Sequence, residues 1–197
     1  MKKQRLARVE NVTRETQIDL TLNLDGSGKY QVHTTLPFLD HMMELFAKHG
    51  RFDLKVKAKG DTHIDDHHLV EDLGIALGAA IAKAVGDKKG ITRYGNFLLP
   101  MDETLSYVAL DLSNRPYFVY KVKWVHSQVG RFDGLLLEHF FESVASSARM
   151  NLHMALKYGK QPHHIAESLF KGFARALSQA VSQDPRVRGI PSTKGKL

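Results

Sequence analysis

The chain has 197 residues, of which 43% are hydrophobic and 25% are charged, and it contains no cysteine. This composition is typical of a soluble globular protein. It excludes disulfide bonds and thiolate metal sites, so only histidine and carboxylate groups remain to hold a metal. The formal net charge is +7 with scattered lysines and arginines, which favours a phosphate-containing small molecule over a nucleic acid as the partner.

Membrane and secretion signals are missing from the sequence. No apolar run approaches the roughly 18 residues that a membrane span needs. The basic stretch 1–5 leads into no apolar signal segment. We therefore expect a cytoplasmic protein with no membrane partner, whose length fits one large domain or two small fused halves.

The first part of the chain predicts four strands in which apolar and polar residues alternate, so that each strand has one buried face. They span residues 5–12, 16–24, 29–34 and 54–58. Residues 25–28 predict a hairpin turn between the second and third strands. A helix should run from Pro37 to Gly50, with Gly50 as its C-cap, and a longer one from His67 to Val85, closed by Gly86.

The second part predicts a similar series. Residues 90–99 form a connector with a short strand, and strands over 104–111 and 117–125 follow. A helix begins at residue 134 and should continue to residue 156, closed by Gly159. The last helix follows Pro162 and runs to about residue 181, before a basic tail.

One motif occurs in both parts, as HHLVE at residues 67–71 and HHIAE at residues 163–167. On a helix, the first histidine and the glutamate lie on one face, about 5–6 Å apart at Cβ, and can bind one metal ion together. The second histidine points about 100° away and is free to reach another ion. An acid-His-apolar-apolar-Glu segment precedes each copy at nearly the same spacing, with His41 in the first and His139 in the second.

This repeat predicts an α+β fold of two duplicated halves, about 1–92 and 93–197, that form a single catalytic unit over residues 1–197. Each half should hold a small, mostly antiparallel or mixed sheet covered on one face by two helices.

Eight residues of the repeat are predicted metal ligands: His41, His67, His68, Glu71, His139, His163, His164 and Glu167. Two ions, each with three imidazoles and one carboxylate, would use all eight. In the symmetric solution His164 crosses to the set of His67 and Glu71. His68 likewise crosses to the set of His163 and Glu167, and the upstream histidines complete the two sets. Such a set leaves open positions in six-coordination, which suits Mn²⁺ or Fe²⁺ and indicates catalysis. Isolated histidines are more often structural or surface groups, and we assign His33, His126 and His153 to that class.

Further segments match one known family, and they cover nearly the whole chain: 14–16, 38–50, 61–74, 93–95, 101–103, 115–117, 138–141 and 191–195. With the doubled motif, the chain resembles the imidazoleglycerol-phosphate dehydratase family, lyases of histidine biosynthesis. Its length leaves no room for the phosphatase domain of some members, so the single-function form is expected. The resemblance implies a ribosomal protein S5 domain 2-like fold, two Mn²⁺ ions per site, and a 24-subunit homo-oligomer with sites between subunits.

The resemblance also implies the reaction, in which imidazoleglycerol phosphate loses water to give imidazoleacetol phosphate. A metal at each ring nitrogen would let the ring expel the neighbouring hydroxide, after which a carboxylate removes the adjacent proton. Glu15 is expected to be this base on the resemblance alone, since the sequence by itself indicates an ordinary strand-end carboxylate. Glu71 and Glu167 complete the expected catalytic set.

Substrate contacts are expected at the metal ligands His41, His67 and Glu71, at Glu15, and at a set of cationic and hydroxyl groups. Arginine beside a turn can clamp phosphate with two parallel bonds. The expected groups are Arg93, Arg115, Lys171 (one helical turn beyond Glu167), Ser192, Thr193 and Lys194. His49 and Asp102 should touch substrate or orient ligands. Metal-bound histidines usually donate their second N–H to a carboxylate, for which the sequence does not choose among Asp40, Asp65, Asp66 and Asp72.

Two other function classes stay open at this point. A histidine-rich metal storage or delivery protein would need similar ligands but no anion clamp. A basic nucleic-acid-binding protein would not need eight ligands at repeated spacing.

Overall fold

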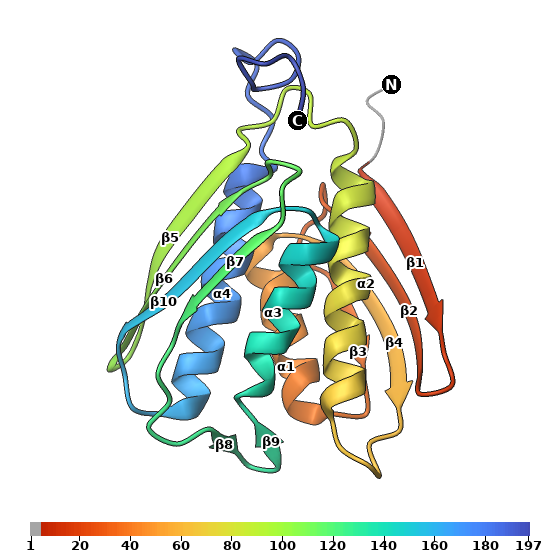
Figure 1. Cartoon of the computed structure of the whole chain (residues 1–197), viewed down its shortest axis with the longest axis vertical. Helices are drawn as coiled ribbons and strands as arrows, with labels where there is room; N and C mark the ends of the chain where they lie inside the picture. The colour runs from red at the N-terminus through yellow and green to blue at the C-terminus, as the bar shows by residue number, and fades with distance from the viewer. Residues whose placement is uncertain (1–4) are drawn as a thin grey trace.

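Two four-stranded sheets enclose a layer of four helices in the computed structural model, which describes residues 5–197 (Figure 1). Residues 1–4, part of the basic stretch in which the sequence predicts no signal segment, lie outside the described residues. Within residues 5–197, none of the helices combines the length and the apolar character that crossing a membrane requires.

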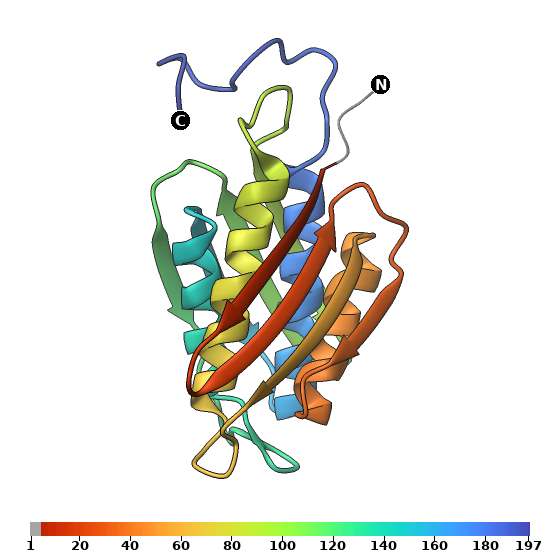
Figure 2. The same ribbon diagram turned by 90° about the vertical axis from the view of Figure 1, so that its right-hand side faces the viewer.

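The first half is a sheet with two helices on one face. Its elements are β1 (Leu6–Val12), β2 (Thr16–Asn23), β3 (Tyr30–His33), α1 (Pro37–Gly50), β4 (Asp53–Gly60) and α2 (His67–Val85). The sheet order is β1-β2-β4-β3, and Figure 2 shows this sheet in front of the helices. In β2, Ile18, Leu20 and Leu22 are buried under the helices and alternate with more exposed polar residues, as the sequence predicts.

The second half repeats this topology. Its elements are β5 (Tyr94–Met101), β6 (Thr104–Asp111), β7 (Tyr117–Lys121), β8 (Gln128–Val129), β9 (Phe132–Asp133), α3 (Leu136–Ser147), β10 (Asn151–Tyr158) and α4 (Pro162–Ala180). The sheet order β5-β6-β10-β7 corresponds strand for strand to the first sheet, and the small hairpin of β8 and β9 is an insertion. The predicted α+β fold of two duplicated halves is therefore confirmed.

The predicted hairpin at residues 25–28 is wrong. β3 does not return along β2 but lies at the sheet edge, parallel to β4. The Asp53 carboxylate accepts the backbone N–H groups of Ser27 (2.8 Å) and Lys29 (3.0 Å), which holds the chain where it passes the start of β4. Because parallel strands need a crossover connection, α1 links β3 to β4.

The C-cap predicted at Gly50 is also wrong. Gly50 is the last residue of α1, and Arg51 takes the left-handed conformation with φ of 58°. A Cβ on Gly50 would lie 2.3 Å from Cε2 of Phe52, so glycine is needed there because the ring packs closely against the backbone. By contrast, Gly86 closes α2 with φ of 66°, as predicted.

The helix predicted over residues 134–156 is wrong in its second half. α3 ends at Ser147, and the chain then enters β10, a central strand that pairs with β6 and β7. Leu152 and Met154 are buried while His153 between them is exposed, which is the alternation of a strand. Arg149 adopts φ of 53°, like Arg51 in the matching turn of the first half. Aligning the two halves would therefore have placed the end of α3 before Arg149 and a strand after it.

Two other boundaries differ from the prediction. β5 is a full edge strand rather than a connector with a short strand. β7 ends at Lys121 instead of residue 125, because the chain leaves the sheet to form the β8–β9 hairpin. This hairpin packs Phe132 against Phe38, with ring centroids 5.2 Å apart.

The helices pair across the halves, α2 with α3 and α1 with α4. Gly74 and Gly78 on α2 let the backbone of α3 approach closely, since a Cβ on either would lie 2.6 Å from a carbonyl oxygen of α3. In the other pair, the rings of Phe46 and Phe173 stack with centroids 5.6 Å apart. This exchange brings each upstream histidine beside the motif helix of the opposite half.

Candidate functional site

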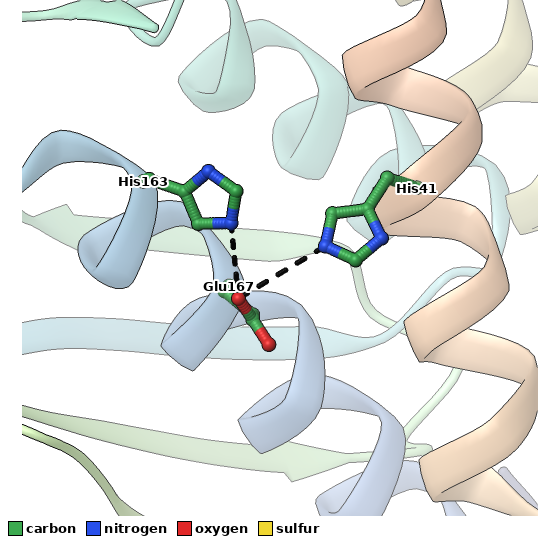
Figure 3. Close-up of side chains that lie close together, drawn as sticks. All are labelled: His41, His163 and Glu167. Carbon is green, nitrogen blue, oxygen red and sulfur yellow. Dashed lines mark hydrogen bonds and ion pairs between the residues drawn. The ribbon is translucent and has the colours of Figure 1, made fainter.

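The best-formed ligand group joins α1 to the start of α4 and consists of His41, His163 and Glu167 (Figure 3). Oε2 of Glu167 lies 3.1 Å from Nε2 of His163 and 4.0 Å from Nε2 of His41. The three ligand atoms all lie within 4.8 Å of one another, and Glu167 is only 7% exposed. The geometry therefore suits a single metal ion bound between α1 and the start of α4.

The corresponding group joins α3 to the start of α2. Nε2 of His67 lies 3.5 Å from Oε2 of Glu71, and the rings of His67 and His139 have centroids 4.8 Å apart. The Glu71 side chain is 45% exposed, against 9% for that of Glu167, so this group is more open. Both groups contain two imidazoles and one carboxylate, and each draws residues from both halves.

The crossed sets predicted for His68 and His164 do not form within this chain. Nδ1 of His68 lies 3.1 Å from both oxygens of Asp61, and Nδ1 of His164 lies 2.7 Å from Oε2 of Glu103. The reason is the helical rotation of about 100° per residue, which turns each second imidazole toward the loop or turn beside its own helix. Each group is thus left with three protein ligands from this chain.

Charge around Glu167 differs from charge around Glu71. Burial alone would raise the pKa of the Glu167 carboxyl, but the ammonium group of Lys171, which donates to Oε1, outweighs it together with His41 and His163 and holds that pKa below its ordinary value. Ile75 occupies the corresponding position, one turn beyond Glu71. The two groups therefore contain the same kinds of ligand atoms but have different neighbouring residues.

His49 lies two turns beyond His41 on α1. Burial, and then the positive charges of Lys171 and Arg175, lower the pKa of its imidazole. A neutral imidazole beside two cations of α4 fits the predicted role in contacting substrate or orienting ligands, which stays a prediction.

The turns before β2 and before β6 correspond to each other, with the sequence Arg-Glu-Thr at residues 14–16 and Asp-Glu-Thr at residues 102–104. Glu15 is exposed, and its negative charge acts on His68, so it lies at the motif end of α2. The hydroxyl of buried Thr16 donates to Asp72 on α2, which anchors this turn.

The carboxylates that hold the second imidazoles are not the predicted ones. Asp40 and Asp65 accept backbone N–H groups instead, and Asp66 precedes α2 with its pKa raised by burial and by Asp65. The repeat aligns Glu103 with Glu15, but this alignment does not tell that Glu103 binds an imidazole. Nothing in the sequence pattern distinguishes Asp61, which reaches His68 only because the loop before α2 folds back.

Of the predicted phosphate-binding residues, Lys171 lies beside Glu167, and the others lie at the other end of the molecule. Arg93 is 9% exposed and binds both oxygens of Asp111, at 2.7 and 3.0 Å, and the carbonyl oxygen of Pro191 at 2.8 Å. The side chain of Asn114 donates to the carbonyl of Leu197 at 3.1 Å, so the tail rests on this end. The exposed Arg115 and the tail residues Ser192, Thr193 and Lys194 lie there as well.

The helices α2 and α4 separate the two ends. Each has 19 residues, and at 1.5 Å per residue they hold the ligand groups about 28 Å from this tail end (Figure 1). One chain therefore does not bring both sets of predicted residues to one small substrate.

Comparisons with known proteins agree on one family. The family model for imidazoleglycerol-phosphate dehydratase matches residues 34–177. The chain is similar to the imidazoleglycerol-phosphate dehydratase of Geobacillus kaustophilus, with 54% identity over 98% of this chain and 99% of the relative. It is likewise 54% identical to that of Corynebacterium diphtheriae, over 98% of each chain.

Two solved structures show the same fold. The crystal structure of the dehydratase from Staphylococcus aureus has a TM-score of 0.82 and 36% identity, over 90% of this chain and 99% of that chain. The structure from Pyrococcus furiosus, in complex with (S)-C348, has a TM-score of 0.83 and 35% identity, over 96% of this chain and 100% of that chain.

Proposed function

Since this chain belongs to the imidazoleglycerol-phosphate dehydratase family, hydro-lyases of histidine biosynthesis, we propose that it converts imidazoleglycerol phosphate into imidazoleacetol phosphate and water with two bound Mn²⁺ ions. The observation that carries the proposal is the ligand group of His41, His163 and Glu167, whose ligand atoms all lie within 4.8 Å of one another. The corresponding residues His67, His139 and Glu71 gather more loosely at the same end of the helix layer. The absence of cysteine from the sequence agrees with a cytoplasmic enzyme.

The residues present fit such ions. Imidazole nitrogen and carboxylate oxygen both bind Mn²⁺, and three protein ligands leave positions for substrate. One group, His41, His163 and Glu167, would hold the first ion, and the other, His67, His139 and Glu71, the second. When bound, the ions supply Lewis acidity that draws electron density from the imidazole ring of the substrate.

Glu15 is proposed as the base. The hydroxide on the carbon beside the ring leaves first and takes up one proton to become water. Glu15 then takes the proton from the carbinol carbon next to the phosphate-bearing carbon, which balances the proton that the hydroxide took up. The resulting enol becomes the ketone when a proton adds to the carbon beside the ring and the enol oxygen releases its own proton. The exposed position of Glu15 at the motif end of α2, together with its charge acting on His68, supports this role.

A complete site needs a second copy of the chain. The ligand groups and the tail end lie at opposite ends of α2 and α4, each about 28 Å long, and this separation is explained if a neighbouring subunit supplies the phosphate contacts. The same neighbour would supply the imidazole that completes each set of ligands, His68 or His164. A closed homo-oligomer, with the 24 subunits that the family resemblance implies, would satisfy every site at once.

The test is metal content measured together with turnover. We expect about two Mn²⁺ per chain, loss of ketone release after chelation, and recovery when Mn²⁺ is restored. Protein that binds metal but releases no ketone from imidazoleglycerol phosphate would favour a storage or delivery protein. Protein that binds no transition metal would contradict the proposal.

A further inference from the structure

Both second imidazoles of the HHxxE motifs are held in the same way, through Nδ1 and by a carboxylate. Nδ1 of His164 lies 2.7 Å from Oε2 of Glu103, and Nδ1 of His68 lies 3.1 Å from each oxygen of Asp61. The two contacts come from unrelated loops, since Glu103 lies between β5 and β6 and Asp61 lies after β4. The agreement between the halves therefore does not follow from the repeat alone.

The Glu103 carboxylate is fixed by several donors. Its Oε1 accepts the Thr104 hydroxyl at 3.0 Å and the backbone N–H groups of Gln161 and Lys160 at 2.9 and 3.2 Å. These two backbone groups immediately precede α4, so the carboxylate is built into the start of the helix that carries His164. Oε2 remains for the imidazole.

The loop that carries Asp61 is fixed as well. Its backbone N–H donates to the carbonyl of Glu15 at 3.1 Å, and its carbonyl accepts the N–H of Ile64 at 2.8 Å. The Asp61 side chain is only 14% exposed, which limits its freedom to leave His68.

An ionised carboxylate only accepts hydrogen bonds, so the Nδ1 atom that faces it carries the proton. In a neutral imidazole the lone pair then lies on Nε2, which is the atom left to bind a metal. Asp102 lies 3.6 Å from Nε2 of His164, which is beyond hydrogen-bond distance, and its side chain is 74% exposed. That nitrogen therefore remains available.

We propose that Glu103 and Asp61 are positioning residues, which fix His164 and His68 as Nδ1–H tautomers and aim their Nε2 atoms outward at the metal ions of a neighbouring copy. This inference rests on the proposed function, because it takes the second imidazoles to be metal ligands between copies.

The repeat gives this assignment a further consequence. Glu103 occupies the position that corresponds to Glu15, but Glu103 is committed to His164. In the first half the His68 imidazole is bound by Asp61 instead, and the Glu15 carboxylate has no hydrogen-bond partner among residues 5–197. One copy of the duplicated glutamate thus holds a ligand while the other is free to move a proton.

The experiment compares Glu103→Gln and Asp61→Asn with the control Glu10→Gln, which removes an exposed carboxylate paired with Arg8 on the outer face of β1. Long-range ¹H–¹⁵N spectra of the metal-free proteins report the tautomer of each imidazole. Mn²⁺ affinity is measured from the EPR signal of the free ion. Wild type and control should show Nδ1–H at His164 and His68. Each of the two variants should lose that tautomer at its own histidine and bind Mn²⁺ about 10- to 100-fold more weakly.

Two failures can be told apart. Wild type that takes up no Mn²⁺ overturns the proposed function, and the metal role of both carboxylates with it. Wild type that binds about two Mn²⁺, next to variants with unchanged tautomers and unchanged affinity, overturns the positioning role alone. Each carboxylate acts on a different histidine, so either variant decides the question if the other does not fold.

Discussion

At the scale of single residues, the structure separates groups that look equivalent in the sequence. Glu15 and Glu103 stand in matching turns, yet only Glu103 is bonded to an imidazole. The motif histidines and glutamates were predictable because their helical spacing is fixed. The partners of the second imidazoles were not, because Asp61 and Glu103 reach them through loop geometry that no period describes.

The base assignment leads to a prediction at this scale. Glu15→Gln keeps the size of the side chain but removes the proton acceptor, so turnover should fall about 10²- to 10⁴-fold. Mn²⁺ uptake should stay at the wild-type level, because Glu15 belongs to neither ligand group. Steady-state kinetics with metal analysis checks both values, and Glu10→Gln serves as the control. A Glu15→Gln enzyme with full turnover and bound metal would remove Glu15 from this role.

At the scale of elements, the close packing of two helices explains which glycines cannot be replaced by larger residues. Gly74 and Gly78 lie one turn apart on α2, where the backbone of α3 leaves no space for a methyl group. The sequence predicted α2 and its extent but not its contact with α3, because a helix of small and apolar residues can pack against several neighbours. The strand β10 was missed for a related reason, since a short apolar run fits both periods.

Gly74→Ala should therefore destabilise the protein although alanine favours helices. The new Cβ would meet the Phe140 carbonyl oxygen at 2.6 Å, and an overpacked contact costs about 1–3 kcal/mol. Urea unfolding of the metal-free protein measures the change. Ile75→Ala on the same helix, at a partly exposed position, is the matched control. Equal stability of Gly74→Ala and wild type would show that the two helices can move apart without loss.

The connection between β2 and β3 predicts that the stability of the protein depends on pH. The backbone N–H groups of Ser27 and Lys29 hold the pKa of the Asp53 carboxyl below its ordinary value. A lowered pKa in the folded state contributes stability at pH values above the unfolded pKa of about 3.9, and this contribution is lost as the pH falls through the folded value. Asp53→Asn should therefore lower the urea midpoint at pH 7, and its difference from wild type should shrink as the medium becomes strongly acidic. A difference that stays constant over this range would contradict the ionic origin.

At the scale of the whole molecule, the internal repeat predicted two halves with one topology, and the structure confirms it. The separation between the ligand groups and the tail end could not be predicted, because sequence spacing does not tell which ends of the helices meet. Arg93 shows the difficulty, since its turn position fits a phosphate clamp while its side chain holds Asp111 and Pro191.

The proposed sharing of sites between copies predicts that two inactive variants restore each other's activity. Glu15→Gln damages the motif end of a subunit and Arg115→Ala damages the tail end. Subunits of the two variants, dissociated and reassembled together, should recover roughly a quarter of wild-type turnover, the share of random pairs in which both ends are intact. Each variant reassembled alone is the control. Mixed assemblies that stay as inactive as their parents would place both ends in the site of one subunit.

The exchange of helices between the halves bears on how this architecture arose. Each ligand group takes one histidine from one half and its motif pair from the other, so a lone ancestral half would have held no complete group. Two identical half-chains that packed together in the same way would make the same contacts, with two identical groups. In one fused chain the two copies can differ in sequence, as they do at position 171, which is lysine, and at the corresponding position 75, which is isoleucine.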